Sequence, residues 1–323
     1  MRVNYILKRN GNVIIIYFIF LAMLIVGGFV SGIFFGPRNI GNIFEQATAL
    51  GIVALGQMLV ILTGGIDLST GSVVSFATTF MSLALFGNTV GGMALSALAV
   101  IGISAVVGLG NGICVTKLKL PPFIVTLASM SIVTGIALIQ RPQPGGSLSF
   151  DFMQILNGRI GIMPRATILW FALTALLFFI LKYRRFGRDL YAVGGNENAA
   201  TLSGVFVNKT KLKAYVLGSV FSAIGGIYLA SRVGTGDATL GTYFSLDSIT
   251  VCVLAGVSLA GGRGNIVGLI AATFILALIN NILNLAGATS NIQYLVKGAI
   301  LLATIIVFAV RELRTRREGL DNA

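Results

Sequence analysis

Long apolar runs recur along the chain from about residue 12 to about residue 310, and no polar stretch is long enough to form a separate soluble domain. A helix needs about 20 mainly apolar residues to cross a hydrocarbon core about 30 Å thick, because unpaired backbone amides are very costly there. With 56% hydrophobic and only 10% charged residues, the chain is too apolar for a water-exposed fold. The sequence therefore predicts a single all-α, polytopic membrane domain over residues 1–323.

Ten segments meet the length requirement approximately. The first is too long for the apolar core of a signal peptide, about 7–15 residues, so we expect an uncleaved span. The eighth is short and rich in glycine, which favours a tilted, broken or re-entrant segment. The ten predicted spans are 13–35, 43–63, 70–87, 91–115, 122–140, 166–182, 213–231, 246–260, 266–287 and 293–310.

The basic residues predict the orientation of these spans. Placing both termini in the cytoplasm puts 17 of the 23 Lys and Arg residues on that side, as the positive-inside rule requires. Lys297 then lies in the last span, and the basic residues left outside are Arg38, Arg141, Arg159, Arg165 and Arg232. The net charge of +13 accordingly indicates orientation in an inner membrane rather than a nucleic-acid partner.

Several function classes lack the residues they need. The chain has no histidine, so a Ser/His/Asp triad, a histidine zinc site and an imidazole proton relay are excluded. Cys114 and Cys252 lie in apolar runs and predict neither a disulfide framework nor a metal cluster. We expect no cofactor and no enzymatic activity in this chain.

Two glycine-rich turns separate predicted spans on the cytoplasmic side. In the turn of residues 62–72, Gly64 and Gly65 can end one helix, and Asp67, Ser69 or Thr70 can cap the next, although direct solute contact remains an alternative. The turn of residues 259–265 contains Gly261, Gly262 and Arg263 and has a similar arrangement, which hints at internal duplication. Neither turn has the spacing of a P-loop, so we expect no nucleotide there.

The largest polar interruption is the predicted cytoplasmic loop, about 182–213. Asn196 can cap a short helix that carries Ala199, Ala200 and Leu202, and Gly204 can end it. Such a helix could fit a groove on a soluble partner. A solvated basic loop that only fixes the topology explains the same residues equally well.

Three stretches together resemble the ribose-type monosaccharide ABC permeases: 62–69 (LTGGIDLS), 185–196 (RFGRDLYAVGGN) and 258–264 (SLAGGRG). They occur in order, and the resemblance covers nearly the whole chain. It implies about ten spans, cytoplasmic termini, a second permease copy or related chain, a cytoplasmic ATPase, and a periplasmic or lipid-anchored sugar-binding protein. It also favours coupling of the loop to the ATPase, which would involve Gly194, Gly195, Asn196, Glu197, Ala199, Ala200, Leu202 and Gly204.

Polar residues within the spans are candidates for the translocation path, because such side chains tend to face the bundle interior or a water-filled cavity. Interhelical hydrogen bonding is the alternative for each of them. Gln57 and Asn281 are the first candidates. The others are Glu45, Gln46, Asn111, Thr126, Asp247, Asn280 and Asn284.

The sequence thus predicts the membrane-spanning permease subunit of an ATP-binding-cassette importer for ribose or a related monosaccharide. The loop of residues 141–146 matches no particular sugar, so the substrate is not assigned. An ion-coupled secondary transporter of a small polar solute is the alternative. That class needs titratable or ion-coordinating groups at the membrane midplane, whereas this chain has only ten acidic residues, most of them at predicted helix ends or in loops.

Overall fold

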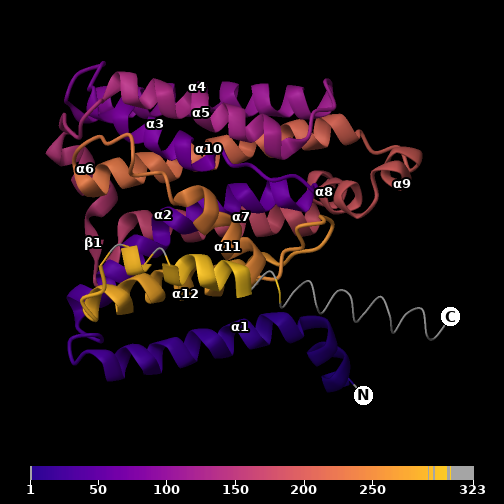
Figure 1. Cartoon of the computed structure of the whole chain (residues 1–323), viewed down its shortest axis with the longest axis horizontal. Coiled ribbons are helices and arrows are strands. Elements are labelled where there is room, and N and C mark those ends of the chain that lie inside the picture. Colours follow the sequence, from indigo (N-terminus) through magenta and orange to yellow (C-terminus); the bar gives the residue numbers. More distant parts are fainter. Residues whose placement is uncertain (1, 290, 294, 304–305, 307–323) are drawn as a thin grey trace.

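The computed structural model describes residues 2–289, 291–293, 295–303 and 306. Among these residues the fold is mainly helical and its strands are only two residues long, which confirms the all-α prediction (Figure 1). The helices are α1 (Arg2–Val30), α2 (Pro37–Leu62), α3 (Thr70–Ser82), α4 (Val90–Thr116), α5 (Pro122–Gln140), α6 (Phe150–Asn157), α7 (Arg165–Tyr183), α8 (Arg185–Gly195), α9 (Glu197–Leu202), α10 (Val207–Val233), α11 (Phe244–Leu254) and α12 (Ile266–Leu285). The strands β1 (Arg159–Ile160) and β2 (Met163–Pro164) form one antiparallel hairpin.

Six of the described helices are long and apolar enough to cross a membrane: α2, α4, α5, α7, α10 and α12. The apolar stretch Ile14–Val30 of α1, the helix α11 and the stretch Asn291–Ala303 are shorter. The predicted tenth span, 293–310, lies partly outside the described residues. The polytopic architecture is therefore confirmed, while the count of ten spans and the placement of the termini stay predictions.

Helices α2 and α10 form the centre of the bundle. In the most apolar window of α2, 89% of the residues are buried, against 22% in α5, whose side chains face outward. α10 packs against α2, α3 and α4. Gly56 permits close approach in this centre, because a Cβ there would lie 2.8 Å from the Gly218 carbonyl oxygen of α10.

Helices α3 and α11 are too short to cross the membrane. At 1.5 Å per residue they are about 20 Å and about 16 Å long, against a hydrocarbon core of about 30 Å. α3 ends at Ser82, short of the predicted 70–87, and Ala84 in the following turn adopts a φ of 49°. α11 ends at Leu254, in agreement with a short or broken eighth segment.

The segment of residues 234–243 runs beside α3 before α11 begins. Thr78 Oγ1 donates to the Asp237 carbonyl at 2.9 Å, and the Gly241 amide donates to Ser75 Oγ at 2.9 Å. Ser245 Oγ, in the first turn of α11, accepts from the Gly71 amide at 3.0 Å and donates to the Leu68 carbonyl at 2.7 Å. The first turns of α3 and α11 are thus hydrogen-bonded to each other, which fixes the two half-length helices as a pair.

The bundle has two distinct ends (Figure 1). One end, on the right of Figure 1, carries α8 and α9 and the start of α1, and we name it the α9 end. The opposite end carries α6 and the β1–β2 hairpin, and we name it the β1 end. Helix α6, helix α8 and the hairpin were not predicted. The sequence of α8 is polar and was interpreted as part of a loop, and the hairpin strands are only two residues long.

Candidate functional site

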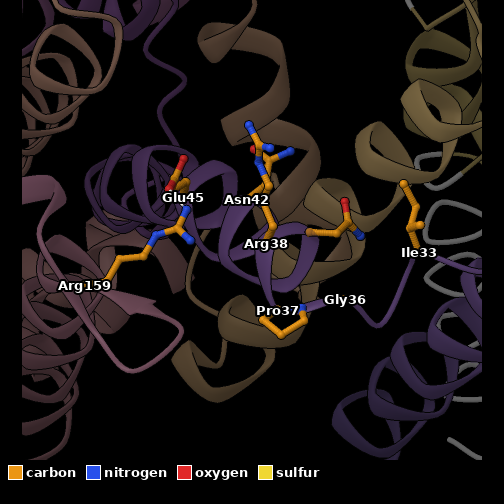
Figure 2. A pocket seen from close by; sticks show the side chains of 8 residues that line it. Ile33, Gly36, Pro37, Arg38, Asn42, Glu45 and Arg159 are labelled. Atoms are coloured by element: carbon orange, nitrogen blue, oxygen red, sulfur yellow. Dashed lines mark hydrogen bonds and ion pairs between the residues drawn. The ribbon is translucent and has the colours of Figure 1, made fainter.

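A cavity of about 770 Å³ opens at the β1 end of the bundle (Figure 2). It is formed mainly by the connection from α1 and the first three turns of α2, and Arg159 of β1 lines it on one side. In Figure 2 the side chain of Arg159 reaches from β1 toward Glu45 on α2. The lining residues are Ile33, Gly36, Pro37, Arg38, Asn39, Asn42, Glu45 and Arg159.

Glu45 is the centre of a charged network at this cavity. One carboxylate oxygen accepts from Arg159 Nη2 at 3.0 Å, and the other accepts from Arg232 Nε of α10 at 3.2 Å. Arg232 Nη2 also donates to Asn42 Oδ1 at 2.9 Å. Because one carboxylate faces two guanidinium groups and Arg38 lines the same cavity, this end of the bundle has an excess of positive charge.

Asn281 connects α12 to the same region. Its amide group pairs with that of Asn39: Asn39 Nδ2 donates to Asn281 Oδ1 at 3.0 Å, and Asn281 Nδ2 donates to Asn39 Oδ1 at 2.7 Å. Asn281 is buried, so it acts here as an interhelical contact beside the cavity. Its neighbour Asn280 has a buried Oδ1 without a hydrogen-bond partner in the described part of the chain.

Two other candidates for the path gather around the connection from α2 to α3, residues 63–69. Asn111 of α4 donates to Ser69 Oγ at 3.0 Å, and Thr126 of α5 donates to the Ile66 carbonyl at 3.2 Å. Both side chains are buried. They hold the non-helical connection in place, as interhelical hydrogen bonds do in membrane bundles.

The predicted path residues therefore form two groups and not one continuous line. Glu45 and Asn281 belong to the cavity at the β1 end, while Asn111 and Thr126 belong to the α2–α3 connection. Gln57 is fully buried on α2, and neither its Nε2 nor its Oε1 has a partner among the described residues. Gln46 is half-buried beside Glu45 in the chain. Whether these side chains contact a solute stays a prediction.

Arg159, Arg232 and Asn42 were not identified as site residues from the sequence. The signal was present, because Arg38, Arg159 and Arg232 belong to the few arginines that the charge pattern leaves outside. An acidic residue near the start of an apolar helix, such as Glu45, needs a basic partner at the same level of the bundle. The sequence could not show which of these arginines lie beside Glu45.

Three segments meet at the α9 end: the end of α2, the end of α8 and the turn between α11 and α12. The Gly262 amide donates to the Leu62 carbonyl at 3.0 Å, and Tyr191 Oη of α8 donates to the Gly264 carbonyl at 3.1 Å. A Cβ on Gly261 would lie 2.8 Å from the Gly64 nitrogen and 2.9 Å from the Gly194 Cα. The three stretches that carry the family resemblance are therefore in direct contact.

The two glycine-rich turns mostly have the predicted local structure. Gly64 ends α2 with a φ of 77°, and its amide donates to the Ile61 carbonyl at 2.9 Å. The capping prediction for α3 was wrong in detail: Ser69 is the N-cap residue, but its side chain accepts no backbone amide of α3. Instead the Asp67 carboxylate accepts from the Ser69 amide at 2.8 Å and from the Ser69 hydroxyl, so it fixes the connection before the helix. Arg263 is exposed, and its carbonyl accepts from the Ser258 amide at 2.9 Å.

The predicted short helix in the polar loop is confirmed as α9. Asn196 Oδ1 accepts from the Ala199 amide at 2.9 Å, and Gly204 follows the last turn with a φ of 77°. Glu197 forms an ion pair with Lys211 near the start of α10. Leu202 is 90% exposed, so its apolar side chain does not pack in the core. An exposed leucine at the tip of a capped helix is suited to contact with a partner.

Comparison with known proteins shows similarity along most of the chain. Residues 39–305 match the family described as branched-chain amino acid transport system / permease component. The ribose import permease protein RbsC of Bacillus subtilis (strain 168) is 36% identical over 290 residues, which cover 88% of this chain and 89% of that protein. RbsC of Escherichia coli (strain K12) is 35% identical over 89% of this chain and 91% of its own length.

A galactose relative covers still more of the chain. The galactose/methyl galactoside import permease protein MglC of Escherichia coli (strain K12) is 33% identical over 95% of this chain and 96% of that protein. No solved structure shows significant similarity. On the family match and on these full-length similarities, the chain belongs to the family of membrane permease components of transport systems.

Proposed function

We propose that this chain is the membrane-spanning permease subunit of an ATP-binding-cassette importer that carries a monosaccharide across the inner membrane. The observation that carries the proposal is the similarity to ribose and galactose import permeases over 88% to 95% of the chain. Ribose or a related sugar is the proposed substrate. The chain itself only translocates, and ATP hydrolysis takes place on a partner.

The α9 end faces the cytoplasm in this proposal, and the β1 end faces the binding protein. The basic residues at the start of α8 and at the start of α10 support this orientation, because Lys and Arg are retained on the cytoplasmic side. The partners are a cytoplasmic ATPase at α9, a periplasmic or lipid-anchored sugar-binding protein at the β1 end, and a second permease chain beside this one in the bilayer.

Helix α9 is the proposed contact with the ATPase. It is capped by Asn196, fastened to α10 by the Glu197–Lys211 ion pair, and presents Leu202 to solvent. ATP-driven closure of the ATPase would displace this helix, and the transporter would then shift between states that favour the outward-open and the inward-open path. Such a shift requires a difference in binding free energy between the two states, which the ATPase supplies.

Affinity purification of the tagged chain in mild detergent tests the proposal. We expect an ATPase to co-purify, with hydrolysis stimulated by a sugar-loaded binding protein. Leu202→Ser should abolish recovery of the ATPase without changing the amount of chain in the membrane, because the side chain is exposed. Leu85→Ser, at an exposed leucine of the opposite end, is the control and should recover the ATPase normally. Normal recovery with the Leu202 variant would contradict the assignment of α9.

The alternative, an ion-coupled secondary transporter, has one feature in its favour. Asp247 of α11 and Lys297 form an ion pair at 2.7 Å, and less than a fifth of each side chain is exposed. Such a pair could respond to a coupling ion. Uptake that persists without ATP while an ion gradient is maintained would favour this alternative.

A further inference from the structure

We propose that a glycine junction at the α9 end carries the motion of the coupling helix α9 to both half-length helices, α3 and α11. We define the glycine junction as Leu62, Gly194, Gly261 and Gly262. The proposal rests on the proposed function, because it assigns a route for the movement that the ATPase would impose. It makes Gly194 and Tyr191 positioning residues for transport.

The first step of the route is from α9 to α8. Only Asn196 separates the two helices, and its side chain caps α9 while its amide donates to the Ala192 carbonyl of α8 at 3.1 Å. α8 is held firmly against the bundle, since Leu190 and Val193 are buried. A displacement of α9 is therefore transmitted to the end of α8.

The second step is from α8 to the two turns. A Cβ on Gly194 would overlap both the Leu62 carbonyl oxygen and the Gly262 amide nitrogen, the two partners of the hydrogen bond that joins the turns. The main chain of α8 therefore lies directly on that hydrogen bond. The bond from Tyr191 Oη to the Gly264 carbonyl attaches α8 to the same turn a second time. Burial raises the pKa of the Tyr191 phenol, so it remains a donor at physiological pH.

The third step is from the turns to the half-length helices. Leu62 is the last residue of α2, and the short connection after it leads into α3. Gly261 and Gly262 lie between α11 and α12. Because Ser245 also bonds the first turn of α11 to the start of α3, the junction is attached to two helices that are joined to each other. α3 and α11 are shorter than the hydrocarbon core is thick, so each can shift without moving a whole span.

The decisive comparison is Gly194→Ala with Gly110→Ala. Gly110 lies on α4, away from the glycine junction, and a Cβ there meets nothing within 4 Å. In the complex with ATPase and sugar-loaded binding protein, we expect Gly110→Ala to transport at the wild-type rate. Gly194→Ala should retain ATP hydrolysis but lose about tenfold in sugar transported per ATP, a typical size for a coupling between sites. Tyr191→Phe adds no atom to the junction and should lower the same ratio by a smaller factor.

Amide hydrogen exchange on the purified chain gives a second readout that needs no ATPase. Gly194→Ala should speed exchange in residues 258–264, where the Gly262 amide loses its acceptor, and Gly110→Ala should leave it unchanged. Equal transport per ATP in both alanine variants would overturn the proposal, and so would unchanged exchange in Gly194→Ala. If Gly194→Ala does not assemble, Tyr191→Phe with wild-type coupling would overturn it instead. Failure of the wild-type chain to recruit any ATPase would contradict the proposed function itself, whatever the exchange shows.

Discussion

At the scale of single residues, Asn196 gives the clearest link from sequence to structure. Its side chain accepts from the Ala199 amide and begins α9, in a loop that would otherwise be polar and irregular. A six-residue helix is too short to be stable by itself, so its cap and its attachment to α10 decide whether it forms. Leu202 is the last residue of α9, so its exposed position depends on that helix being formed.

Replacing Asn196 should therefore unravel α9. Asn196→Ala removes the acceptor for the Ala199 amide and should cost about 1 kcal/mol of local stability. Asn198→Ala is the matched control, because Asn198 is exposed and no hydrogen bond of its side chain is found in the described part of the chain. Amide exchange in residues 197–202 should accelerate only in the Asn196 variant, with lower sugar uptake. Equal exchange in the two variants would show that the cap does not hold α9.

Local sequence rules predicted the structural roles of some residues and not of others. Asn196, Gly64 and Gly204 were predicted correctly, because caps and left-handed turns depend on a few neighbouring residues. The role of Asp67 was only partly predicted, and the partners of Glu45 and Asn281 were not predicted at all. Those contacts join residues 114 to 242 positions apart in sequence, and no local pattern encodes such pairs.

At the scale of elements, the charged network at the β1 end joins three segments. Glu45 of α2 bonds to β1 through Arg159 and to α10 through Arg232. The apolar runs predicted spans over most of α2 and α10, but they carried no information on the hairpin. The hairpin has two-residue strands, which are below the length at which a pattern is visible.

Removing the shared carboxylate should cost more than removing one arginine. Glu45→Gln leaves the guanidinium groups of Arg159 and Arg232 close together without a counter-charge, and should lower the free energy of unfolding by about 1–2 kcal/mol. Arg159→Gln preserves the pair of Glu45 with Arg232 and should cost less. Thermal unfolding in one detergent compares the two variants. A larger loss in Arg159→Gln would contradict the central position of Glu45.

The charges of Asp247 and Lys297 should stabilise the folded chain only when both are present. Each single variant, Asp247→Asn or Lys297→Met, leaves one poorly solvated charge without its partner. Each should destabilise the chain by about 3 kcal/mol. The double variant should lose clearly less than the sum, because no unpaired charge remains.

An exposed pair gives the control for this cycle. Asp189 and Arg185 are 3.8 Å apart on α8, with the Arg185 side chain 70% exposed, so Asp189→Asn should change stability by less than about 0.5 kcal/mol. Strictly additive effects at Asp247 and Lys297 would show that the two side chains do not stabilise each other.

At the scale of the whole molecule, the bundle divides its functions between two ends. The α9 end joins the three stretches that carry the family resemblance and presents α9, while the β1 end has a positively charged cavity. Composition and apolar runs predicted the membrane fold, since six described helices can cross a bilayer. They could not predict that α3 and α11 are half-length helices bonded to each other, because that arrangement is set by tertiary contacts.

The most direct test of the central claim is sugar uptake into vesicles that contain the chain. Vesicles hold the chain with its ATPase, ATP is enclosed, and the sugar-loaded binding protein is supplied outside. We predict uptake that requires both ATP and the binding protein and that continues after ionophores collapse the proton and sodium gradients. Uptake by the chain alone, without ATP and driven by an ion gradient, would contradict the account and identify an ion-coupled transporter.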